Sequence, residues 1–181
     1  MPAPSLAPIR RTVTVSWDQP SAFKRFTAQF AQWWPHQEMS VGGRRIRDVV
    51  FECKQGGRIF EIHVDGARFK WGTVTEWNPP HGVAFTWHSS RAESDAQLVE
   101  VTFTAIAEGT RVELVSSGWD KLGSAAQQAY NGYTMSWRVV LDVFAGRRGL
   151  LFLMFWLFSF LMDNSKGRQA FVDNALGRMS D

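Results

Sequence analysis

The alternating apolar pattern in the middle of this chain is the feature that most constrains its fold. Several short segments between residues 45 and 117 place apolar side chains at every second position, which is the period of a half-buried β-strand. Turn sequences such as "QGG", "DG" and "NPP" separate them, so successive strands are expected to pair as antiparallel neighbours. The expected strands cover 45–54, 58–64, 67–77, 82–88, 97–106 and 111–117.

The segments on either side of this meander complete the fold prediction. A further strand is expected over 10–17, and the residues from 20 to 35 have a helical period that suits one amphipathic helix or a bent pair. From 124 to 145 the apolar residues again recur every three or four positions, which predicts a long helix. A sheet with one apolar face needs a cover, and this helix is the only element long enough. We therefore predict an α+β domain in which a curved antiparallel sheet of six or seven strands wraps around the C-terminal helix.

Length and charge set further limits. A chain of 181 residues suits one domain, with a flexible arm over 1–9, the domain over 10–145 and an extension over 146–181. The net charge of +3 is spread over small basic clusters, so no nucleic-acid partner is expected. The single cysteine, Cys53, cannot form an internal disulfide and is expected to be buried. The absence of a signal-like N-terminus and of disulfides favours the cytoplasm.

Several longer phrases resemble a known group of proteins. Between Arg10 and Ala145 the chain reads, in order, "AFKRFTAQFAQWWP", "GGRIFE", "WGTVTEWNPP", "VAFTWH", "VEVTFTAIAEGTRVELVSSGWDKLG" and "NGYTMSWRVVL". With them the chain resembles the SRPBCC or START-like superfamily, which has the helix-grip fold of the birch-pollen allergen. Within it, the match is to heat-shock-protein ATPase activator homologues, which are related to polyketide cyclases. The resemblance implies a cavity between sheet and helix that binds a hydrophobic or amphipathic small molecule.

The expected ligand-binding residues are the apolar side chains that alternation and helical spacing direct toward this cavity. For the strand over 67–77 we expect Trp71, Thr73, Thr75 and Trp77 to face inward rather than Gly72, Val74 and Glu76, since burying two indoles is strongly favourable. Where relatives tend to have glycine at the start of the last helix, this chain has bulky Tyr133 and Met135, which would reduce the cavity. The expected lining is Phe30, Trp34, Phe60, Trp71, Phe85, Trp87, Val101, Phe103, Tyr133 and Trp137.

No catalytic residue, metal or cofactor is predicted. None of the four histidines has metal-ligand spacing, and His63 and His88 are expected on the solvent side of their strands. Glu61 or Glu76 could serve as an acid only if it faced the cavity. Three functions therefore remain open: non-catalytic binding of a hydrophobic small molecule, which we prefer, an enzyme of the cyclase or hydrolase kind, and a protein-interaction module of the chaperone-activator type.

The C-terminal extension contains an apolar run from Leu150 to Met162 that is interrupted only by Ser159. Thirteen helical residues reach about 20 Å, which is too short for about 30 Å of hydrocarbon. The run has no polar face, so a helix there needs apolar contact on several sides. Helices are expected over 149–162 and 169–176. The first is expected to pack on its own domain or a second copy of the chain, with shallow membrane contact as the alternative.

Overall fold

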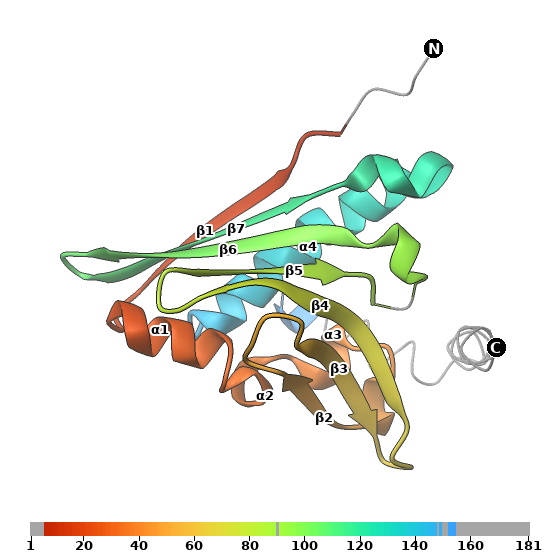
Figure 1. Cartoon of the computed structure of the whole chain (residues 1–181), viewed down its shortest axis with the longest axis horizontal. Coiled ribbons are helices and arrows are strands. Elements are labelled where there is room, and N and C mark those ends of the chain that lie inside the picture. The colour runs from red at the N-terminus through yellow and green to blue at the C-terminus, as the bar shows by residue number, and fades with distance from the viewer. Residues whose placement is uncertain (1–5, 90, 148, 150–151, 155–181) are drawn as a thin grey trace.

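The fold is built on one seven-stranded antiparallel sheet (Figure 1). The computed structural model describes residues 6–89, 91–147, 149 and 152–154. The sheet order is β1-β7-β6-β5-β4-β3-β2, so the first two strands of the chain form its opposite edges. The strands are β1 (Ile9–Val15), β2 (Ile46–Phe51), β3 (Arg58–His63), β4 (Arg68–Asn78), β5 (Gly82–Trp87), β6 (Gln97–Ile106) and β7 (Gly109–Ser117).

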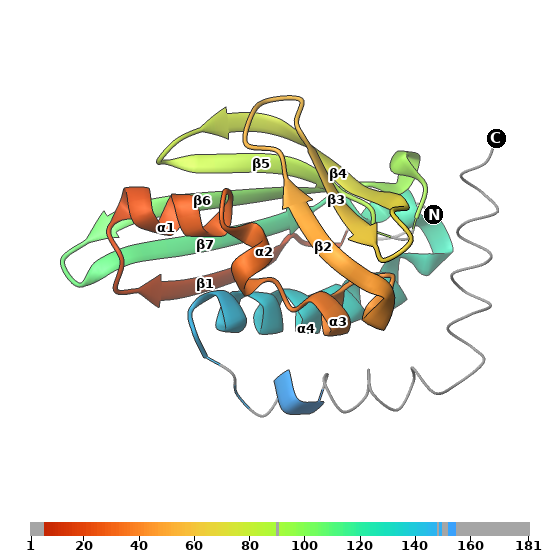
Figure 2. The same ribbon diagram turned by 90° about the horizontal axis from the view of Figure 1, so that it is seen from below.

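The helices cover one side of this curled sheet. The segment that joins the two edge strands contains α1 (Gln19–Phe26), α2 (Phe30–Trp33) and α3 (His36–Met39), and a 3-10 turn follows it at Gly43–Arg45. After β7, a 3-10 segment (Trp119–Ala125) leads into the long helix α4 (Ala126–Phe144). Figure 2 shows α1 lying across β6 and β7, and α4 running along the β1 side of the sheet.

The local sequence explains where the first helix begins and ends. The Asp18 side chain caps α1 by accepting a hydrogen bond from the Ser21 backbone N–H at 2.8 Å, and Pro20 occupies its first turn. The hydroxyl of Thr27 donates to the carbonyl of Phe23 at the other end. The segment from 20 to 35 is thus a bent series of short helices, which was one of the two forms that its period allowed.

The apolar core lies between the sheet and the helices. It combines inward side chains of every strand with rings from α1 and α2 and with the second half of α4. This arrangement confirms the predicted α+β helix-grip fold with a curved sheet around a long C-terminal helix. The side chains that α4 adds to the core are Trp137, Val140, Leu141 and Phe144.

An irregularity in β4 explains why its sequence allowed two readings. The pairing of β4 with β5 shifts between Val74 and Glu76, which leaves Thr75 as an extra residue in the strand. Because of this bulge Val74 and Trp77 both pack on the core, although an unbroken alternation would place them on opposite faces. A second shift, in the pairing with β3, leaves Trp71 as an extra residue and lets it share the core with Val74. The expectation for Thr75 and Val74 was therefore wrong, while that for Trp71 and Trp77 was right.

Two further expectations about single residues were wrong. Cys53 is exposed because it lies in the turn that follows β2, beyond the buried Phe51. Met135 is also exposed, on the outer face of α4, so it takes no space from the interior.

The C-terminal extension lies almost entirely outside the described residues. There, only residues 152–154 are described as helical, and the expected helices over 149–162 and 169–176 otherwise fall beyond the described part. Among the described residues, no helix combines the length and the apolarity that a membrane crossing requires.

Candidate functional site

The centre of the core is a cluster of four tryptophans from four different elements. Trp34 follows α2, Trp71 lies on β4, Trp87 ends β5 and Trp137 belongs to α4. Ring centroids are 5.4 Å apart for Trp34 and Trp71, 5.3 Å for Trp71 and Trp87, and 5.4 Å for Trp87 and Trp137. At these distances the rings contact each other directly. A flat ligand that stacked between two of them would need about 7 Å, so the cluster must open to admit one.

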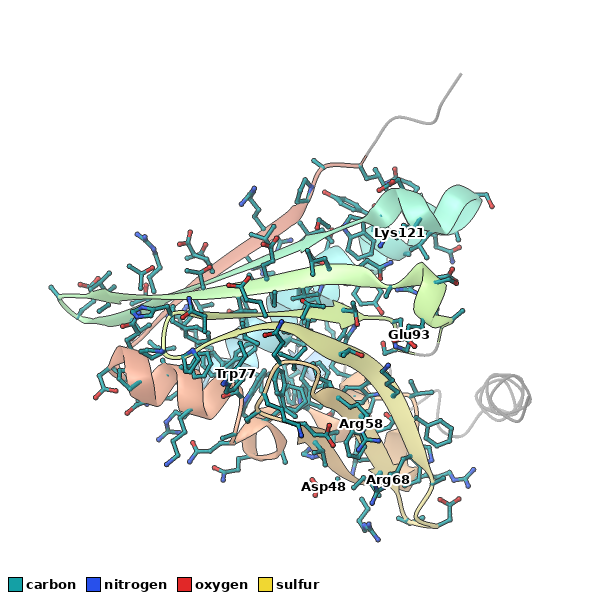
Figure 3. All side chains as sticks on the ribbon, viewed as in Figure 1. Asp48, Arg58, Arg68, Trp77, Glu93 and Lys121 are labelled. Carbon is teal, nitrogen blue, oxygen red and sulfur yellow. The ribbon has the colours of Figure 1, made fainter. Side chains whose placement is uncertain are left out.

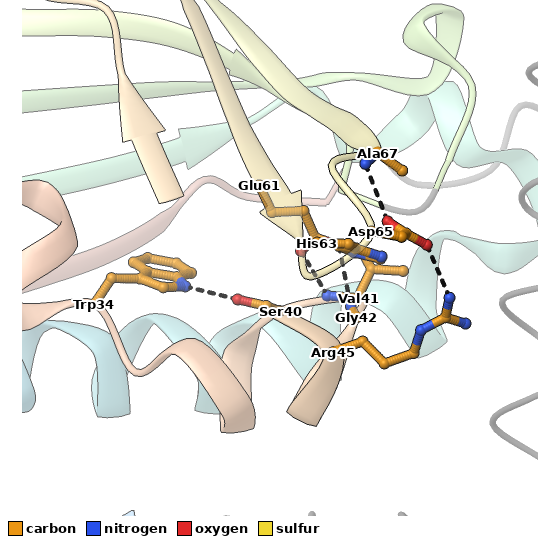
Figure 4. Close-up of polar contacts among 9 residues, drawn as sticks. All are labelled: Trp34, Ser40, Val41, Gly42, Arg45, Glu61, His63, Asp65 and Ala67. Atoms are coloured by element: carbon orange, nitrogen blue, oxygen red, sulfur yellow. Dashed lines mark hydrogen bonds and ion pairs between the residues drawn. The ribbon is translucent and has the colours of Figure 1, made fainter. Parts of the chain in front are cut away.

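Two of these indoles have a buried N–H group with no hydrogen-bond partner. They belong to Trp71, which is 0% exposed, and Trp137, which is 3% exposed. Both rings touch Trp87, so the two donors lie in one region of the core. An unpaired buried donor costs about 1–3 kcal/mol, and buried indole N–H groups usually have an acceptor. The indole of Trp34 differs because it donates to the Ser40 hydroxyl at 3.3 Å (Figure 4).

The first half of α4 covers the tryptophan cluster on the side that faces the loop after β5. Tyr133 packs against Trp137, and its hydroxyl lies 3.2 Å from the Ser89 hydroxyl. The Arg91 guanidinium carbon lies 5.2 Å from the centre of the Tyr133 ring. Tyr133 is only half-buried, in contrast to Trp137 one turn later. Tyr133 is therefore a partly exposed residue that covers Trp137 of the tryptophan cluster.

The structure brings nine of the ten predicted lining residues to the core. Eight belong to the buried cluster and Tyr133 packs against it. Phe60 is the exception, because its ring lies outside the core with the guanidinium carbons of Arg58 and Arg68 5.4 and 5.6 Å from its centre. These two arginines can be followed in Figure 3. Phe60 is thus buried, at 7% exposed, but apart from the core cluster, and whether any of the ten residues contacts a ligand stays a prediction.

The inner face of β3 carries two polar residues, of which His63 was expected on the solvent side while the orientation of Glu61 was left open. Ile59, Glu61 and His63 point inward, with Glu61 0% and His63 2% exposed. The apolar set of Phe60, Ile62 and Val64 suggested the opposite orientation. Val64, however, lies at the hairpin turn and is largely exposed, so it is no guide to the buried face.

Glu61 and His63 form a buried polar cluster with the segment after α3 (Figure 4). One Glu61 carboxylate oxygen lies 2.6 Å from His63 Nε2 and accepts the Gly42 N–H at 3.0 Å, and the other accepts the Val41 N–H at 3.0 Å. The His63 ring packs on Phe69, with centroids 4.3 Å apart. Gly42 is required here, since a Cβ atom at that position would lie 2.3 Å from His63 Nε2.

Burial raises the pKa of Glu61, although His63 and the two backbone N–H groups act in the opposite direction. The three hydrogen bonds that the described residues make to this carboxylate all come from the protein itself. The arrangement therefore ties residues 41–42 to β3, and it also places an ionisable pair inside the domain. The sequence offered only one signal for it, the spacing of two residues between Glu61 and His63 on one strand.

His88 was also expected on the solvent side and is instead 6% exposed. Its Nδ1 lies 3.0 Å from the Arg91 carbonyl oxygen, which can only accept, so Nδ1 carries the proton. The ring thus holds the loop after β5 in place. Glu76, the other carboxylate considered as an acid, is exposed. Among the described residues no three histidine, cysteine or carboxylate side chains gather in a way that could hold a metal ion.

Comparison with known proteins agrees with this geometry. Residues 21–145 match the family described as activator of Hsp90 ATPase homolog 1-like protein. No curated protein sequence matches the chain.

Three solved structures illustrate the likeness in fold. Protein MLL2253 from Mesorhizobium loti is 16% identical with a TM-score of 0.56, and the match covers 77% of this chain and 94% of that one. Protein NE0264 from Nitrosomonas europaea is 12% identical with a TM-score of 0.54, covering 77% and 92%. The anthrahydroquino-gamma-pyrone synthase Txn09, in complex with a molecule denoted SUM, is 31% identical with a TM-score of 0.50, covering 70% and 86%.

Proposed function

Since this chain belongs to the family of activator of Hsp90 ATPase homolog 1-like proteins and has a fold of the polyketide cyclase type, we propose that it binds an apolar small molecule between the sheet and α4. The ligand carries a hydrogen-bond acceptor, such as a ring carbonyl oxygen. It lies against Trp71, Trp87 and Trp137 and is bound without chemical change.

The observation that carries this proposal is the pair of unpaired indole N–H groups in the tryptophan cluster. Trp71 and Trp137 leave two donors buried among aromatic rings, where no acceptor of the described residues reaches them. A ligand carbonyl in this region would satisfy one or both of them. A purely apolar ligand would leave both unsatisfied, so the cluster favours an acceptor-bearing molecule.

Access requires the cover of the cluster to move, because the rings are in contact in this conformation. Tyr133 is the residue to displace, since it is half-buried and the hydroxyl contact with Ser89 joins it to the loop after β5. Its movement would separate the first half of α4 from that loop. The second half of α4 is buried along its inner face and would keep its place.

A matched pair of ligands tests this proposal. Fluorenone and fluorene have the same ring system and differ by a carbonyl group in place of a methylene group. Binding is followed through quenching of tryptophan fluorescence. We expect fluorenone to bind about tenfold more tightly than fluorene, because a carbonyl that meets an unpaired indole N–H gains about one net hydrogen bond.

The substitution Trp137→Phe removes the N–H group and keeps an aromatic ring. We expect it to abolish the preference for fluorenone while leaving the affinity for fluorene within about twofold. Trp33→Phe is the matched control, since the Trp33 N–H already donates to the Arg25 carbonyl at 2.8 Å outside this cluster. Equal binding of the two ligands to the parent protein, or a preference that survives in both Trp71→Phe and Trp137→Phe, would contradict the proposal.

Catalysis is the second candidate function, and the buried Glu61–His63 pair is the observation that favours it. The pair lies on the same inner face of the sheet as Trp71, and one relative of this fold is a synthase. We rank it lower because the Glu61 oxygens are held by two backbone N–H groups and by His63. Recovery of a bound ligand unchanged, as shown by mass spectrometry, supports binding alone. Conversion of the ligand that Glu61→Gln abolishes would support catalysis.

A further inference from the structure

The free edge of the sheet at β1 has an unpaired position at its centre. The carbonyls of Arg10 and Thr14 both accept hydrogen bonds from arginine side chains on the outer edge, from Arg11 Nη1 at 2.8 Å and from Arg147 Nη2 at 3.3 Å. Because backbone direction alternates along a strand, Thr12 between them also directs its N–H and C=O away from β7. No described residue pairs with these two groups of Thr12.

A groove runs beside this edge, between β1 and α4. Its volume is about 370 Å³. Its floor includes the buried side chains of Val13 and Leu141, and its walls carry charged groups. The lining residues are Arg11, Thr12, Val13, Arg138, Leu141 and Asp142.

The charge around the groove is predominantly positive. Arg11 and Arg138 line it, Arg147 reaches the Thr14 carbonyl beside it, and Asp142 is the one acidic residue of the lining. The Arg11 guanidinium donates to the Thr134 carbonyl at 2.9 Å, so it is fixed against α4 and its Nε remains buried without a partner. Such a groove attracts a negatively charged partner.

We propose that the edge of β1 accepts an extended acidic peptide segment of another protein as an added strand. Thr12 exchanges the central pair of backbone hydrogen bonds with it, and Arg138 contacts its acidic side chains. This is strand addition to an exposed sheet edge, in which main-chain bonds give affinity and the groove selects side chains. The surface is separate from the tryptophan cluster, so the proposal does not depend on ligand binding.

The charges argue against the other occupants of this edge. A second copy paired across a two-fold axis at Thr12 would bring Arg11 and Arg138 of both copies into one region, where they repel. The segments of this chain beyond the described residues are not acidic either. Residues 1–5 contain no acidic residue, and residues 163–181 contain equal numbers of acidic and basic residues.

The test uses a fluorescein-labelled, end-capped octapeptide of alternating glutamate and valine, with fluorescence anisotropy as the readout. We expect saturable binding to the full chain that weakens as salt is added. A peptide of alternating lysine and valine is expected not to bind. Failure of the acidic peptide to bind at low salt, or equal binding of the lysine peptide, would overturn the proposal.

A backbone variant tests the geometry directly. Thr12→Pro removes the outward N–H and leaves the β1–β7 hydrogen bonds intact, so it is expected to fold and to bind the acidic peptide about tenfold more weakly. Thr12→Val is its matched control, because it changes the side chain and keeps the N–H. If Thr12→Pro folds with the circular dichroism of the parent and binds as tightly as Thr12→Val, the peptide does not pair with β1 and the proposal fails.

A pair of charge variants distinguishes binding in the groove from attraction of the peptide by the net positive charge of the protein. Arg138→Glu is expected to weaken binding about tenfold, whereas Lys24→Glu, an equal change of charge on an exposed position of α1, is expected to leave it within twofold. An equal loss in both variants would show attraction by net charge alone and contradict the proposal. A dimer of the parent protein that Thr12→Pro dissociates, without peptide binding, would assign the edge to a second copy and also contradict it.

Discussion

The substitution Glu61→Ala is expected to release the segment after α3 from β3 and to destabilise the domain strongly. It removes the acceptor of the Val41 and Gly42 N–H groups and of the His63 ring. Each buried donor left without an acceptor costs about 1–3 kcal/mol, and water can reach the half-buried Val41 and Gly42. We therefore expect a loss of about 3–5 kcal/mol, which lowers the Tm of a domain of this size by roughly 10 °C.

Urea unfolding followed by tryptophan fluorescence measures this loss. Glu61→Gln is the matched variant, since it keeps the shape and one acceptor but turns an amide NH₂ group toward a donor. We expect it to lose about half as much stability as Glu61→Ala. An unfolding free energy of Glu61→Ala within about 0.5 kcal/mol of the parent would refute the view that this carboxylate holds residues 41–42 to the sheet.

The same carboxylate gives stability a defined dependence on pH. Burial raises the pKa of Glu61 in the folded protein, so the folded state binds this proton more tightly than the unfolded state. This difference stabilises the folded protein fully at pH values below the pKa that Glu61 has in the unfolded chain. The stabilisation is lost as the pH rises through the higher pKa that Glu61 has in the folded protein. The unfolding free energy of the parent is therefore expected to fall over that range relative to Glu61→Gln. Parallel pH profiles of the two proteins would contradict this.

Three more substitutions or truncations address other parts of the structure. Gly72→Ala is expected to lower the unfolding free energy by at least about 3 kcal/mol or to prevent folding, because the new Cβ atom would lie 1.7 Å from the Thr86 carbonyl oxygen. An unfolding free energy close to that of the parent would contradict the close approach of β4 to β5 at this position. Phe60→Ala is expected to lower stability by about 2 kcal/mol without changing fluorenone affinity, since the ring packs outside the core. The full chain is expected to self-associate in light scattering and a chain truncated after Ala145 to be monomeric, because the truncation removes the apolar run at 150–162. Flotation of the full chain alone with liposomes would assign that run to membrane contact.

The fold could be predicted because burial imposes a period on the sequence. Strands that bury one face alternate and the covering helix repeats every three to four residues, so the element order was visible before any contact was known. Val99, Val101 and Phe103 on β6 show this clearly, since all three are buried on one face as their spacing requires.

The errors occurred where alternation alone does not decide which face is buried. On β3 the more apolar set contains Phe60, yet the set that faces inward contains Glu61 and His63, because residues 41–42 supply backbone donors to Glu61 from a distant part of the chain. On β4 the extra residue Thr75 shifts the alternation in mid-strand. In both cases the buried face depends on residues outside the strand itself: residues 41–42 for β3 and the neighbouring strand β5 for β4.

The sequence predicted which tryptophans lie in the interior, but not how their rings are arranged there. Trp71, Trp87 and Trp137 were expected in the interior, and they are there. Whether their rings contact each other or leave space depends on how far α4 lies from the sheet, which is a property of the whole core. The two unpaired indole N–H groups likewise became visible only once every neighbouring acceptor had a position.

The most direct test of ligand binding follows the indole N–H signals of the nine tryptophans by ¹H–¹⁵N NMR. Trp→Phe variants assign the signals of Trp71 and Trp137. On addition of fluorenone, the account predicts that these two signals shift downfield in proportion to occupancy, as expected for N–H groups that gain an acceptor, while the already bonded indole of Trp34 changes less. Saturable binding that leaves both signals unmoved would contradict the proposed site.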